Sequence, residues 1–272
     1  ADRAAGHRRG SRCHGAAADE FGWTPELLSV LLEDEATKTA VAAILMDLAN
    51  GGTMFSQRLR DRITACRLVG IAKPTSGVRP IAMTATLLNL AGALLLRGNA
   101  NAIREHFLPL QFGICVPQGI EIISHQVRAS LKRPGTAALS LDLKAGFQLP
   151  LRAKIKEQLS QPKWRGFVNY WNLVYAKPSD LHVYSDGRHS VIQSQRGTRQ
   201  GCAWGSFLFA LVLHPILLGM AQQFPDLELR CYIDDLSIVG SDPARMAAAA
   251  HWFDEKVRKE HQSEINFSKC AW

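Results

Sequence analysis

Residues 227–240, LELRCYIDDLSIVG, decide the fold because they read as two short strands separated by two adjacent acidic residues. Apolar and polar side chains alternate through the first half, which is the period of a half-buried strand. A second apolar run follows at residues 236–239. The stretch therefore predicts a tight β-hairpin that carries two carboxylates at its tip.

Those carboxylates belong to Asp234 and Asp235. Adjacent carboxylates repel each other, so holding them together favours a site where a cation or a proton neutralises them. Aspartate is also a common turn residue, and a solvated Asp-Asp turn explains the same pattern. The hairpin alone leaves both interpretations open.

Composition limits the class of partner. The chain has 272 residues, 47% of them hydrophobic, and a formal net charge of +8. A basic balance of this size favours a polyanion such as nucleic acid. The six cysteines are scattered, with no pairing at zinc spacing, which predicts a reduced intracellular compartment. The apolar runs are too short to span a bilayer, so we expect no membrane partner.

Two basic segments are candidates for binding that polyanion. Residues 1–20 are rich in Ala, Gly and Arg and lack apolar periodicity, so we expect a tail that is disordered when free. Residues 67–83 predict a hairpin that carries Lys73 and Arg79 close to its turn. A point charge beside a planar guanidinium suits a polyphosphate. A solvated basic surface is the competing interpretation of both segments.

A third carboxylate lies far away along the chain. Asp142 falls in the apolar strand predicted over residues 137–143. A polar, glycine-bounded loop at residues 195–201 then opens into an apolar helix, which we expect Pro215 to kink or end. If Asp142 converges with the hairpin, three carboxylates could bind two divalent cations for an in-line phosphoryl displacement. Alone, an aspartate at the end of a strand is more often a helix cap or a turn former.

Six segments in order resemble the reverse transcriptase domain, particularly that of non-LTR retrotransposons, the spliced-leader-inserting kind among them. The segments are KPTSGVRPIAM, QFGICVPQGIEIISHQVR, LDLKAGF, GTRQG, YIDDL and INFSKC. The resemblance implies an α+β fold, the fingers and palm of a right-hand polymerase, with an antiparallel palm sheet and helices on one face. It places the fingers in residues 21–135 and the palm in residues 136–272.

The resemblance also implies roles for individual residues. Asp142, Asp234 and Asp235 would be the catalytic carboxylates that hold two Mg²⁺ ions, with Mn²⁺ as an alternative. The nucleotide would contact a wider group: Lys73, Arg79, Phe147, Gln200, Gly201 and Lys269. Phe147 matches the bulky residue that excludes a ribose 2′-hydroxyl, which disfavours an RNA-templated RNA polymerase. Tyr232 and Arg199 would face primer and template.

The implied activity is RNA-directed DNA polymerisation from dNTPs on an RNA template and primer. The chain departs from the family at Gln148 and at residues 202–204, where the family commonly has Asn and Asp-Pro-Leu. Losing that Asp-Pro removes a helix cap and would loosen the pocket. No thumb follows Cys270, so a partner chain would have to supply it. The alternative is a domesticated, inactive subunit that binds RNA within a ribonucleoprotein.

Overall fold

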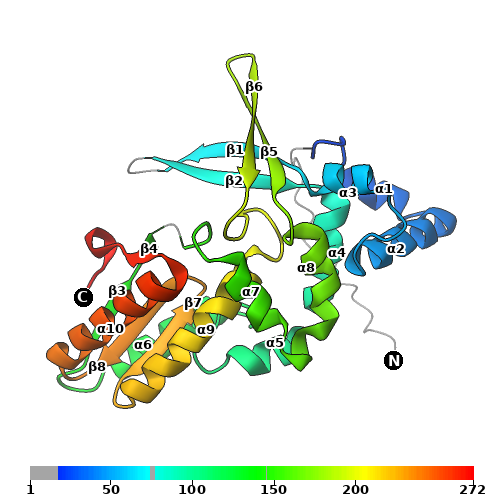
Figure 1. Cartoon of the computed structure of the whole chain (residues 1–272). Helices are drawn as coiled ribbons and strands as arrows, with labels where there is room; N and C mark the ends of the chain where they lie inside the picture. Colours follow the sequence, from blue (N-terminus) through cyan, green and yellow to red (C-terminus); the bar gives the residue numbers. More distant parts are fainter. Residues whose placement is uncertain (1–17, 74–76, 145) are drawn as a thin grey trace, which may run out of the picture.

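The computed structural model describes residues 18–73, 77–144 and 146–272, which form an α+β fold (Figure 1). The first half contains α1 (Pro25–Leu31), α2 (Glu35–Ala49), α3 (Gln57–Thr64), β1 (Cys66–Ala72), β2 (Val78–Thr84), α4 (Thr86–Gly98), α5 (Ala100–Phe107), α6 (Gly119–Ser130), β3 (Ala137–Leu141) and β4 (Leu143–Lys144). The second half contains α7 (Arg152–Leu159), η1 (Pro162–Phe167), α8 (Val168–Val174), β5 (Ser179–Ser185), β6 (Arg188–Ser194), α9 (Gly205–Gln223), β7 (Glu228–Tyr232), β8 (Asp235–Gly240), α10 (Pro243–His261), β9 (Glu264–Ile265) and η2 (Phe267–Lys269).

The predicted hairpin forms two strands of an antiparallel sheet with the order β3-β8-β7. Leu229 and Cys231 are buried while the residues between them are only partly covered, which confirms the alternation predicted from sequence. Helices α9 and α10 lie side by side across the apolar face (Figure 1). The polar face of the same strands is left for the carboxylates.

Helix α9 joins the two hydrophobic cores of the molecule. Phe207 and Leu211 belong to the core formed with the N-terminal helices and α8, whereas Phe209 and Leu213 pack against the palm sheet. The helix continues through Pro215 to Gln223, so of the two predicted outcomes, a kink or an end at Pro215, the end is wrong. Burial on both sides offsets the backbone hydrogen bond that proline removes.

The same helix is the one described segment that is long and apolar enough to cross a bilayer by length and composition. In the fold, 67% of that window is buried inside the protein. A helix that links two cores must be apolar over most of its surface, because most of that surface contacts protein. Its hydropathy is therefore accounted for by packing.

The basic hairpin forms as predicted, with β1 and β2 antiparallel and Arg79 opposite Ile71. It is half of a four-stranded sheet with the order β2-β1-β5-β6, at the top of Figure 1. Strand β5 pairs with β1 in parallel, although β5 and β6 lie in the range that sequence assigned to the palm. The boundary at residues 135 and 136 stays a prediction, since this sheet draws strands from both sides of it.

The described end of the N-terminal segment packs against the fold. Residues 1–17 of the predicted tail lie outside the described residues. Asp19 is 9% exposed, and its carboxylate accepts hydrogen bonds from the backbone N–H groups of Trp23 and Thr86 at 2.9 and 2.6 Å. Glu20 pairs with Arg62 at 2.9 Å. The expectation of disorder up to residue 20 therefore does not hold for Asp19 and Glu20.

Candidate active site

Three carboxylates converge on the polar face of the palm sheet. Leu141 pairs with Leu236 in the antiparallel ladder of β3 and β8. Asp142 follows Leu141 and Asp235 precedes Leu236, so the two aspartates lie beside each other. Asp234 occupies the two-residue turn that joins β7 to β8. Two antiparallel strands thus bring together residues that are separated by more than ninety positions in the chain.

Electrostatics support this convergence. The pKa of Asp234 is raised above its usual value by burial, and then by the charges of Asp235 and Asp142. Burial also raises the pKa of the Asp235 carboxyl, and Asp142 adds to the effect. Mutual repulsion of this kind is relieved by a proton or by a metal cation. The site therefore holds partly buried carboxylates of like charge, which a bound cation would stabilise.

Part of that charge is balanced by the C-terminal segment. The Lys269 ammonium lies 3.4 Å from a carboxylate oxygen of Asp142, and the Asn266 amide donates to the same oxygen at 3.2 Å. The Asn266 backbone N–H also donates to the Asp142 carbonyl at 2.8 Å. The segment after α10 thus aligns beside β3 and β4 and delivers Lys269 to the carboxylates.

A pocket of about 410 Å³ opens between the carboxylates and the basic hairpin. It contains most of the predicted nucleotide and metal residues. Its lining is Lys73, Val78, Arg79, Pro80, Asp142, Leu143, Gly146, Phe147, Gln148, Gln200, Asp234 and Lys269. Cations on one side and carboxylates on the other suit a phosphorylated ligand that is accompanied by a metal ion.

The glycine-bounded loop forms the wall beside Phe147. Gly197 has a φ of +60°, and a Cβ there would lie 2.4 Å from the Phe147 carbonyl oxygen. The Thr198 N–H donates to that same carbonyl at 2.7 Å. The Phe147 ring stacks on Phe209 of α9 with 5.1 Å between the ring centroids. The loop and α9 together hold the ring at the mouth of the pocket.

Gly201 acts through its backbone at the base of the basic hairpin. It has a φ of +104°, and a Cβ there would lie 2.5 Å from the Ala82 carbonyl oxygen. The neighbouring Gln200 carbonyl accepts the Ala82 N–H at 2.7 Å. Only glycine fits this approach, which couples the loop to β2. Gln200 lines the pocket, whereas Gly201 is not among its lining residues.

Arg199 does not face primer or template, and the prediction that it does was wrong. Arg199 is 4% exposed, and its guanidinium donates to the carbonyls of Thr64 and Val174 at 2.8 and 2.7 Å. The same group lies 4.9 Å from the centre of the Tyr175 ring. These interior acceptors tie α3 to α8, so Arg199 stabilises the fold. Tyr232 pairs with Asp235 across the hairpin, and its contact with primer stays a prediction.

Gln111 is a positioning residue that sequence analysis missed. Ile233 in the hairpin turn has a φ of +61°, which is strained for a β-branched side chain. The fully buried Gln111 amide accepts the Ile233 N–H at 2.7 Å and donates to the Ile233 carbonyl at 3.0 Å. A Cβ on Gly113 would lie 2.5 Å from the Ile233 side chain. The motif QFG was visible in the sequence, but its contact with the hairpin was not.

Asn89 holds the loop that leads into α9. Helix α9 has no side-chain cap of its own. Instead, the Asn89 side-chain oxygen accepts the Ala203 N–H at 2.6 Å, and its amide donates to the Gly201 carbonyl at 3.4 Å. The prediction that the missing Asp-Pro leaves the start of this helix without a side-chain cap is therefore confirmed. A residue from α4 thus anchors the backbone of the loop that precedes this helix.

Metal binding by the carboxylates stays a prediction. Among the described residues, no group of three or more His, Cys, Asp or Glu side chains is already assembled at metal-binding distances. The donor chemistry nevertheless fits Mg²⁺, which prefers hard carboxylate oxygens. Burial and mutual repulsion raise the pKa values of Asp234 and Asp235, and a divalent ion bound there would offset both effects.

Comparison with known proteins agrees with this geometry. Residues 71–272 match the model of the family described as reverse transcriptase (RNA-dependent DNA polymerase). A retrotransposable element SLACS 132 kDa protein from Trypanosoma brucei gambiense is 27% identical over 226 residues, which cover 82% of this chain and 19% of the relative. The chain therefore spans about a fifth of the length of that relative. These matches confirm the resemblance to non-LTR retrotransposon proteins.

Solved structures give the same fold. Apo telomerase from Candida tropicalis, truncated from its C-terminal domain, superposes with a TM-score of 0.57 at 12% identity, covering 77% of this chain and 50% of that one. Telomerase from the same organism in complex with a fragment of telomeric RNA also gives 0.57, at 11% identity, covering 77% and 41%. At such identity the likeness shows the polymerase fold alone.

Proposed function

Because the chain belongs to the reverse transcriptase (RNA-dependent DNA polymerase) family, we propose that its pocket adds deoxynucleotides to a primer paired with an RNA template. The observation that carries the proposal is the shared pocket, in which Lys73 and Arg79 face Asp142 and Asp234. Cations opposite carboxylates would orient a triphosphate with its α-phosphorus toward the carboxylates. The primer 3′-oxygen would attack that phosphorus, and pyrophosphate would leave.

The chemistry of each pocket side chain suggests its role in binding the nucleotide. Arg79 would grip the phosphates with a planar fork, and Lys73 would add a point charge. Phe147, fixed against Phe209, would collide with a ribose 2′-hydroxyl and so favour dNTPs. Gln200 would contact the base or the sugar from the opposite wall. Each of these side chains lines the pocket.

Asp142, Asp234 and Asp235 would hold two Mg²⁺ ions. When bound, the ions would activate the primer hydroxyl and offset the charge that develops on the phosphates. Lys269 lies near Asp142 and is 55% exposed. It could turn from that carboxylate toward the departing pyrophosphate and supply a proton or a charge. The pocket residues do not specify the template, and the RNA template in this proposal comes from membership of the family.

Primer extension on an RNA template with Mg²⁺ or Mn²⁺ tests the proposal, beside an Asp234→Asn variant. Wild type should extend the primer with dNTPs, and the variant should lose at least a hundredfold in rate. If wild type bound the primer and template but gave no product with either metal, the enzymatic proposal would fail. That result would favour a structural RNA-binding subunit.

A further inference from the structure

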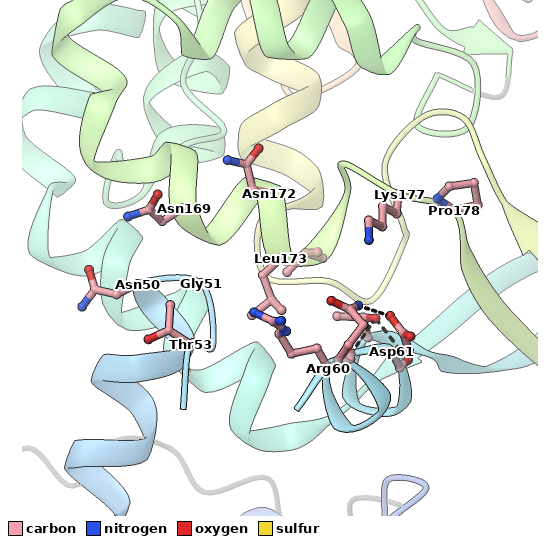
Figure 2. A pocket seen from close by; sticks show the side chains of 13 residues that line it. Asn50, Gly51, Thr53, Arg60, Asp61, Asn169, Asn172, Leu173, Lys177 and Pro178 are labelled. Atoms are coloured by element: carbon pink, nitrogen blue, oxygen red, sulfur yellow. Dashed lines mark hydrogen bonds between the residues drawn. The ribbon is translucent and has the colours of Figure 1, made fainter. Parts of the chain in front are cut away.

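A second polar cavity lies on the side of the molecule formed by α2, α3 and α8. It has a volume of about 260 Å³ and shares no lining residue with the candidate active site. Figure 2 shows side chains from several elements entering it. The lining is Asn50, Gly51, Thr53, Gln57, Arg60, Asp61, Thr64, Asn169, Asn172, Leu173, Val174, Lys177 and Pro178.

Two cations in this cavity lack an anionic partner among the described residues. The side chains of Arg60 and Lys177 make no hydrogen bond or ion pair in the described structure. The nearest acid in the lining, Asp61, instead accepts the Gln57 amide at 2.6 Å. The cavity lining therefore carries two cations and one carboxylate, a formal charge of +1, and neither cation is held in an ion pair.

The partly buried guanidinium of Arg60 points to a ligand in this cavity. Its Nε atom is buried and has no hydrogen-bond partner. An unsatisfied buried donor costs about 1–3 kcal/mol, and more when the group is charged. Proteins rarely retain such a group unless a bound ligand or water completes it. An oxygen of an anion entering the cavity would accept this hydrogen bond.

The remaining walls are rich in side-chain amides. Asn169 and Asn172 make no side-chain hydrogen bond among the described residues, and Asn50 uses only its amide nitrogen, which donates to the Met46 carbonyl at 2.8 Å. Free amides offer both donors and acceptors, which match a ribose hydroxyl or a base edge. Phosphate contacts in nucleic-acid complexes come from Arg, Lys and Asn side chains of this kind.

We propose that this cavity binds one nucleotide unit of single-stranded RNA, with a backbone phosphate between Arg60 and Lys177. The volume is below that of sites for drug-sized ligands, which fits a phosphate and its sugar rather than a larger molecule. The net charge of +8 favours a polyanion. The site lies away from the carboxylates, so it anchors RNA independently of nucleotide addition.

Fluorescence anisotropy with a labelled 20-nucleotide single-stranded RNA tests the site without any polymerisation. Arg60→Gln with Lys177→Gln should weaken binding about tenfold at 100 mM KCl. It should also reduce the slope of log K against log salt by about 0.7 for each phosphate that the variant no longer neutralises. The matched control, Arg97→Gln with Lys156→Gln, makes the same charge change at exposed positions outside both pockets and should bind like wild type. Equal affinity and slope for both variants would overturn the proposal.

Location and ligand class are tested by crosslinking. A photoreactive amino acid at Thr53, on the cavity wall, should crosslink the RNA, and excess unlabelled RNA should suppress the product. Polyglutamate of matched charge should suppress it at least tenfold less. Equal suppression by polyglutamate would show an acidic-peptide site and overturn the RNA assignment. Circular dichroism should show the double variant folded, since neither side chain stabilises another group by hydrogen bonding.

Discussion

Replacing Gln111 with leucine tests how the palm hairpin is held. Leucine has a similar size but cannot bond the backbone of the turn. The substitution removes the acceptor for the Ile233 N–H at 2.7 Å, the donor to the Ile233 carbonyl at 3.0 Å and the acceptor for the Gly113 N–H at 3.0 Å. Each buried group left without a partner costs about 1–3 kcal/mol, so the total loss should be at least about 3 kcal/mol.

The substitution should also slow catalysis in the molecules that remain folded. Ile233 keeps its positive φ only while the surroundings enforce it, at a cost of about 1–3 kcal/mol. Without Gln111 the turn should relax toward an unstrained conformation and carry Asp234 with it. Single-turnover addition of one dNTP should fall at least a hundredfold under conditions in which circular dichroism shows the variant folded.

Urea unfolding supplies the measurement, with Gln222→Leu as the control. Gln222 is exposed on α9, and its replacement should change the free energy of unfolding by less than about 0.5 kcal/mol. Gly113→Ala provides a second route, because its Cβ would lie 2.7 Å from the Ile233 nitrogen. If Gln111→Leu unfolded at the same urea concentration as the control, the turn would not depend on this amide.

The remaining predictions concern charge and selectivity. Burial lowers the pKa of His214 and of His261 from 6.5 to about 4, so the folded state binds fewer protons than the unfolded state between these values. Stability should therefore fall as pH drops from 6.5 toward 4, by about 2 kcal/mol per histidine at pH 5, and a flat profile in urea unfolding would contradict this. Asp234→Asn should raise the thermal midpoint without metal, because it removes repulsion from Asp235, and should reduce the stabilisation that Mg²⁺ gives wild type. Equal Mg²⁺ shifts in the two proteins would argue against a metal at Asp234. Phe147→Ala should raise incorporation of ribonucleotides relative to dNTPs at least tenfold in primer extension, and unchanged selectivity would show that this ring does not meet the sugar.

The sequence by itself determined the strands and hairpins, because their patterns lie within a few neighbouring residues. Strict alternation along β7 specified which of its side chains face the core, because successive side chains of a strand point to opposite faces. The lysine and arginine of the basic hairpin were visible for the same reason, since a turn between two apolar runs brings neighbours together. The order of the motifs was sufficient to indicate the family.

Tertiary structure alone decided the contacts between distant segments. Arg199 lies beside two loop residues predicted to meet the nucleotide, yet its guanidinium points into the interior, where it bonds Thr64 and Val174. Gln111 and Asn89 read as ordinary polar residues because their partners, Ile233 and Ala203, are more than a hundred positions away. Side-chain direction and long-range hydrogen bonding depend on how helices and sheets pack, which no short-range pattern encodes. The sequence alone thus predicted which carboxylates would gather, and packing decided what holds them in place.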